Sequence, residues 1–74
     1  MKEFTVCYTL DNDIKKEKII KGLDAKREEV IQEVLEKVKH DKFFIAKSDE
    51  GDYIINSYLV RYIRVIDEKV LGQI

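Results

Sequence analysis

The sequence contains one cysteine and one histidine, the residue types that most often carry nucleophilic or metal chemistry. Cys7 alternates with Phe4, Val6 and Tyr8, a setting typical of a small packing residue rather than of an activated thiolate. His40 ends a helical pattern, where an imidazole complements the negative end of the helix dipole. The two residues supply too few ligands for a zinc site, and one cysteine cannot form an intrachain disulfide. We therefore expect neither a catalytic residue nor a bound metal.

Two acidic clusters invite a calcium interpretation, but neither has the required spacing. In the stretch that begins at Asp11, Lys16 and Gly22 occupy the positions where an EF-hand needs its glycine and its last glutamate. Residues 49–52 surround Gly51 and are typical of a solvated turn. The three glycines are isolated, so no phosphate-binding loop is expected and no cofactor either. The sequence predicts a protein that is not an enzyme.

A basic segment makes nucleic-acid binding the alternative function. Six cations occupy this short stretch: Lys15, Lys16, Lys18, Lys21, Lys26 and Arg27. Aromatic residues and arginines also interleave near the C-terminus, as they do in stacking platforms: Tyr58, Arg61, Tyr62 and Arg64. Alternation, however, places the two arginines on opposite faces of a strand. The formal net charge is −1, whereas dedicated nucleic-acid binders are clearly basic. Nucleic-acid binding therefore stands second to protein interaction.

The clearest expected elements are an N-terminal strand and a long helix. Residues 3–10 alternate between apolar and polar side chains with a period of two, which predicts a half-buried strand. Residues 24–40 place Val30, Val34 and Val38 four residues apart, which predicts an amphipathic helix with Asp24 as its N-cap. The intervening residues 14–23 are read as a helical turn or an irregular connector, with the choice left open.

The second half of the chain predicts strands. Residues 42–48 and 53–56 form a hairpin around Gly51, which can adopt a positive φ. A bend at Asn56–Ser57 precedes a third strand of the same sheet, residues 59–66. The fold class is therefore α+β: a single β-α-β-β two-layer domain over residues 1–74, with one long helix packed on a small, largely antiparallel sheet. A signal peptide or a membrane span is not expected, and we place the protein in the cytoplasm.

The last strand carries more apolar residues than one helix can cover. The candidate interface residues on it are Leu59, Val60, Tyr62, Ile63, Val65 and Ile66. One alternating set packs under the helix, and the other set is left for a partner, most simply a second copy of the chain. A domain this short also commonly needs a partner chain for stability. Two alternatives stay open: the tail residues Val70, Leu71 and Ile74 fold back over the strand, or a small ligand occupies a cleft of the dimer.

The order and lengths of these elements resemble the YopT family of short, prophage-associated Bacillus proteins of unknown function. The similarity covers most of the chain, through the strand EFTVCYTL, the helix EEVIQEVLEKV and the strands KFFIAKS, DYIIN and VRYIRVID. It implies one helix, three strands and a homodimer, and it assigns no functional residue. With the apolar strand, it predicts a homodimeric protein of a mobile element that acts by binding a further protein.

Overall fold

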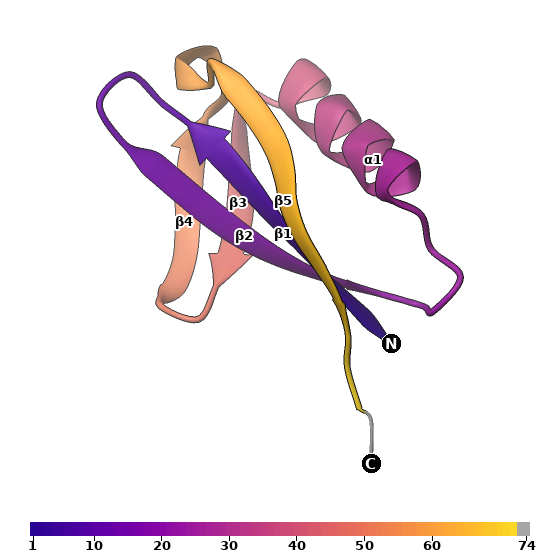
Figure 1. The fold of residues 1–74 in the computed structure, drawn as a ribbon. Helices are drawn as coiled ribbons and strands as arrows, with labels where there is room; N and C mark the ends of the chain where they lie inside the picture. The colour runs from indigo at the N-terminus through magenta and orange to yellow at the C-terminus, as the bar shows by residue number, and fades with distance from the viewer. Residues whose placement is uncertain (73–74) are drawn as a thin grey trace.

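The protein consists of a three-stranded antiparallel sheet that packs on a layer made of one helix and a two-stranded hairpin (Figure 1). The computed structural model describes residues 1–72. The strands of the sheet lie in the order β2-β1-β5, with bounds Ile14–Lys21, Lys2–Thr9 and Tyr62–Val70. The second layer contains α1 (Arg27–His40), β3 (Phe43–Ser48) and β4 (Gly51–Asn56), and a 3₁₀ turn at Ser57–Leu59 leads into β5.

The core lies between these two layers and centres on the middle strand. β1 turns its even-numbered residues inward, and Phe4, Val6 and Tyr8 are fully buried. From α1, Val30 and Val34 reach the same core, because residues four apart lie on one face of a helix. The hairpin contributes Phe44, Ala46 and Ile55.

The α+β class is confirmed, together with the N-terminal strand, the helix and the hairpin. Gly51 adopts the expected positive φ, 117°, where the hairpin turns. The helix begins later than the sequence indicates: its first residue is Arg27 and its N-cap is Lys26, so the assignment of Asp24 as the N-cap is wrong. The Glu29 carboxylate explains this start, because its Oε1 accepts from the backbone N–H of Lys26 at 3.2 Å.

Residues 14–21 are a strand, β2, and not the helical turn or irregular connector expected for residues 14–23. The element order is therefore β-β-α-β-β-β, and the β-α-β-β layout lacks two strands: β2 is missing from it, and β4 and β5 are separate strands divided at Asn56–Ser57. β2 pairs with β1 along its whole length, from Lys2 opposite Lys21 to Thr9 opposite Ile14. Eight backbone partners on a neighbouring strand outweigh the weak strand propensity of a lysine-rich segment.

The last strand also belongs to a different sheet from the one expected. The 3₁₀ turn that follows Asn56 redirects the chain, and β5 pairs antiparallel with β1 rather than with the hairpin. The tail does not fold back over this strand: Val70 is its last residue, and the backbone N–H of Leu71 donates to the carbonyl of Met1 at 2.7 Å. Ile74, the third tail residue named above, lies outside the described residues.

Candidate functional site: an apolar groove beside an edge strand

A groove with a volume of about 740 Å³ runs between α1 and β5. The helix contributes Ile31 and Leu35, which are four residues apart on the flank next to the buried stripe of Val30 and Val34. All of the lining residues are Arg27, Ile31, Leu35, Ile63, Arg64, Val65 and Ile66. The groove is therefore mainly apolar, with an arginine from each of its two walls.

A β-bulge in β5 explains why Ile66 faces this groove. Val65 pairs with Val6 and Asp67 pairs with Thr5, so Ile66 has no partner on β1. A bulge inserts one residue and breaks the strict alternation of side chains, so the consecutive residues Val65 and Ile66 both line the groove. Ile66 and Leu35 remain 42% and 43% exposed, on opposite walls of the groove.

Beside the groove, β5 is an edge strand. In the described part of the chain, β5 has β1 as its hydrogen-bonded neighbour on one side and no strand on the other. Its outer N–H and C=O groups are thus available over nine residues. The groove and this free edge form one continuous surface, which we call the β5 surface.

The structure divides the six candidate interface residues into two groups. Val60, Ile63 and Val65 are partly buried and pack against the core. Leu59, Tyr62 and Ile66 are exposed. The two sets do not follow strict alternation, because the 3₁₀ turn ends at Leu59 and the bulge lies at Ile66. Of the exposed group, Ile66 is the residue that lines the groove, whereas Tyr62 pairs with Thr9 and lies on the outer face of the sheet.

The six residues of the basic segment do not gather on one surface. Lys15 pairs with Asp13 at 2.9 Å, Lys18 with Asp49 at 3.1 Å and Lys21 with Glu33 at 2.5 Å. Arg27 lies 3.9 Å from Glu68. Among the described residues, Lys16 and Lys26 form no ion pair, and they lie on β2 and before α1, respectively. Neighbouring carboxylates thus compensate most of this positive charge.

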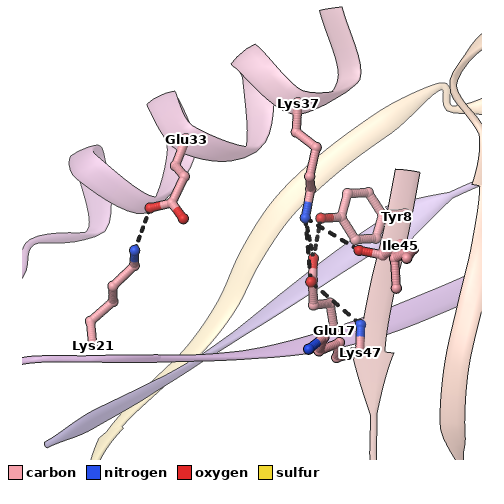
Figure 2. Close-up of polar contacts among 7 residues, drawn as sticks. All are labelled: Tyr8, Glu17, Lys21, Glu33, Lys37, Ile45 and Lys47. Atoms are coloured by element: carbon pink, nitrogen blue, oxygen red, sulfur yellow. Dashed lines mark hydrogen bonds and ion pairs between the residues drawn. The ribbon is translucent and has the colours of Figure 1, made fainter. Parts of the chain in front are cut away.

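Sequence reasoning missed a buried carboxylate, Glu17, which connects four elements (Figure 2). Glu17 on β2 is 5% exposed and accepts a hydrogen bond from the Tyr8 hydroxyl at 2.5 Å. The Lys37 ammonium on α1 lies 3.2 and 3.3 Å from its two oxygens. The backbone N–H of Lys47 on β3 donates to Oε2 at 3.4 Å. Once residues 14–21 are read as a strand, the position of Glu17 on the same face as Ile19 is the signal that reveals it.

This cluster is a structural link rather than a reaction centre. Tyr8 is fully buried, so a substrate cannot reach its hydroxyl. Burial raises the pKa of Tyr8 well above its usual range, and the hydrogen bond to Glu17 raises the pKa further. A tyrosine held neutral beside a carboxylate that is already partnered has no acid–base role near neutral pH. The cluster instead fixes α1 and β3 against the sheet.

The raised pKa of Tyr8 predicts a loss of stability in alkali. Above about pH 10 the unfolded chain releases the Tyr8 proton while the folded protein keeps it, so rising pH favours unfolding. We expect the free energy of unfolding of the wild type to fall more steeply above pH 10 than that of Tyr8→Phe, by up to about 1.4 kcal/mol per pH unit. Urea unfolding between about pH 9 and 11 measures this difference. Tyr58→Phe, which alters an exposed tyrosine, is the control and should keep the pH dependence of the wild type. If Tyr8→Phe and Tyr58→Phe change the pH dependence of the unfolding free energy equally, the loss of stability does not come from Tyr8.

The cysteine and the histidine lie on different elements, β1 and α1. Cys7 is buried on the middle strand, and His40 at the end of α1 pairs with Glu36 at 2.9 Å. Within residues 1–72, no three His, Cys, Asp or Glu side chains gather in an arrangement that could hold a metal ion. The described helix is too short and too polar to cross a membrane.

No protein-family model, curated protein or solved structure matches the chain. The fold and the surfaces described above define a small α+β protein with an open sheet edge, and its function has to be inferred from those surfaces.

Proposed function

We propose that this protein is a non-enzymatic homodimer that acts by binding another protein, and that two copies join through the β5 surface. The observation that carries the proposal is the placement of exposed Leu35 and Ile66 on facing walls of an apolar groove, directly beside the free edge of β5. The role in a mobile element, which the YopT resemblance implies, and the cytoplasmic location expected from the sequence belong to the same proposal.

Energetics favour covering this surface. Burial of apolar surface contributes about 25 cal/mol per Å², and a chain of this length buries only about 60% of its unfolded surface on its own. A partner that fills the groove adds apolar burial where the isolated chain has little. The free N–H and C=O groups of β5 gain hydrogen-bond partners in the same contact.

A second copy fits both parts of the surface better than a small ligand does. A small molecule in the groove leaves the strand edge unpaired, whereas another β5 supplies a complementary row of backbone groups. Two identical edges that meet antiparallel are related by a two-fold axis, so the contact closes at two chains. The bulge at Ile66 and the charged run Asp67–Lys69 limit further edge-to-edge growth.

The test is the oligomeric state of Ile66→Asp. A carboxylate buried without a partner at the interface costs several kcal/mol, so we expect dimerisation at least tenfold weaker than in the wild type, with the fold retained. Sedimentation velocity over a concentration series measures the association, and circular dichroism measures the fold.

Ile54→Asp is the matched control, because Ile54 is an isoleucine with 73% exposure on the hairpin, away from the groove. We expect it to associate like the wild type. A wild-type mass of one chain at every concentration, with a melting temperature independent of concentration, would contradict the proposal.

A further inference from the structure

The face of the three-stranded sheet that points away from the core carries an uneven distribution of charge. Its residues lie in four rows across β2, β1 and β5, and the pairing places Lys16, Cys7 and Arg64 in one row. The next row contains Lys18, Thr5 and Asp67, and the outer rows are Ile14, Thr9 and Tyr62 at one end and Ile20, Glu3 and Lys69 at the other. Four cations therefore face two carboxylates. We call this surface the cationic sheet face.

Two of its cations have no neutralising partner. Glu3 lies 3.8 Å from Lys18 and 3.4 Å from Lys69, and Asp49 of the hairpin turn lies 3.1 Å from Lys18, so carboxylates offset the charge at this end of the face. Lys16 and Arg64 are exposed, and neither forms an ion pair within residues 1–72. The other acidic residues lie mostly on the helix and in the loops, for example Glu28 and Glu36 on α1. The net charge of −1 thus conceals two uncompensated cations, Lys16 and Arg64, in one row of this face.

The shape of this face suits an extended chain. Apart from Glu3 at one end, its middle strand carries only short side chains on this face, the half-buried Thr5 and Thr9 and the buried Cys7, so no long side chain rises between Lys16 and Arg64. Tyr62 lies on the same face two residues from Arg64 and is 67% exposed. An exposed aromatic ring beside cations is the combination on which unpaired bases stack while phosphates are neutralised.

We propose that the cationic sheet face binds single-stranded nucleic acid, with Lys16 and Arg64 contacting phosphates and Tyr62 stacking on a base. Single strands fit better than duplexes, because stacking on Tyr62 requires a base free of its partner. This site differs from the basic segment of residues 15–27: Lys21, Lys26 and Arg27 are not part of it, and Arg64 and Tyr62 are. The site is present on each chain, and it shares Arg64 with the rim of the groove, whereas Lys16 and Tyr62 lie outside the groove.

Fluorescence anisotropy with a labelled oligothymidine tests the proposal. We expect binding that weakens as salt rises, with a slope of about −0.7 in log K against log salt for each phosphate neutralised. The double variant Lys16→Gln with Arg64→Gln should bind at least tenfold more weakly and show a shallower slope. Lys39→Gln with Lys42→Gln removes the same charge from exposed positions near the end of α1 and should bind like the wild type.

Tyrosine substitutions separate stacking from simple charge attraction. Stacking on one aromatic side chain contributes a factor of roughly 5 to 150 in affinity, so Tyr62→Ala should weaken binding within that range. Tyr58→Ala, at an 84% exposed tyrosine outside the sheet face, should have no effect. Polyglutamate of equal charge and a duplex of equal length should bind more weakly than the oligothymidine.

Several results would overturn the proposal. A dissociation constant for oligothymidine above about 10⁻⁴ M at low salt would overturn the proposal, because nonspecific binding alone reaches that affinity. If polyglutamate binds as tightly as oligothymidine, or if Tyr62→Ala leaves the affinity unchanged, the face attracts anions in general and does not recognise nucleic acid. Loss of binding in Lys26→Gln with Arg27→Gln, but not in the Lys16 and Arg64 variant, would move the site to the basic segment. Sedimentation of the same samples reports the dimer separately, so failure of one proposal is distinguishable from failure of the other.

Discussion

Replacing Glu17 with alanine is expected to lower the free energy of unfolding by about 3–5 kcal/mol, a large part of the stability of a small domain. The substitution leaves the buried Tyr8 hydroxyl without its acceptor and removes the anion that faces Lys37. It also removes the acceptor of the Lys47 N–H, so that β1, α1 and β3 each lose a link to β2. Chemical denaturation followed by circular dichroism measures the loss.

Glu33→Ala is the matched control for this prediction. Glu33 also connects α1 to β2, through Lys21, but its side chain is 55% exposed, and exposed ion pairs contribute at most about 1 kcal/mol (Figure 2). Glu17→Gln should fall between the two, because an amide oxygen still accepts from Tyr8 while the charge is lost. Equal destabilisation by Glu17→Ala and Glu33→Ala would show that the buried cluster does not hold the layers together.

Aspartate at two neighbouring helix positions is expected to produce opposite kinds of damage. Val34 is 1% exposed in the core, so Val34→Asp buries an unpaired charge and should unfold the chain. Leu35 is 43% exposed in the groove, so Leu35→Asp should keep the fold and weaken dimerisation. The two variants place the same residue in the same helical turn, which removes helix propensity as an explanation of any difference between them.

Circular dichroism and sedimentation velocity together distinguish these outcomes. Val34→Asp should lose the cooperative thermal transition, and Leu35→Asp should melt cooperatively as a single chain. If both variants unfold, the groove belongs to the core rather than to an interface. If Leu35→Asp remains dimeric, the copies meet at another surface.

The parts of the fold that were predictable are those with a clear apolar period. β1 alternates apolar and polar residues, and α1 repeats valine every fourth residue, so each pattern predicts the secondary structure of its own segment. β2 gives no such signal, because its core-side positions are Lys15, Glu17, Ile19 and Lys21. Polar residues stand there because Glu17 and Lys21 form ion pairs with α1, an arrangement that depends on the tertiary structure.

The candidate site was predictable only in part. The apolar content of residues 59–66 drew attention to the last strand, but the sequence could not divide its residues into buried and exposed sets. The bulge at Ile66 alters the alternation, and a bulge becomes visible only when the strand is aligned with β1. Lys16 and Arg64 lie in one row on either side of Cys7, although 48 positions separate them in the sequence. This arrangement follows only from the strand pairing, which the sequence does not reveal.

The position of β1 between β2 and β5 has a consequence for the order in which the chain can fold. Of the described strands, β1 is synthesised first and lies in the middle of the sheet, whereas β5, one of its two neighbours, is synthesised after the other four. The β1–β2 hairpin can form early, but Phe4, Val6 and Tyr8 gain their full cover only when residues 62–70 emerge. Contacts between such distant positions slow folding and prolong the exposure of apolar surface during synthesis.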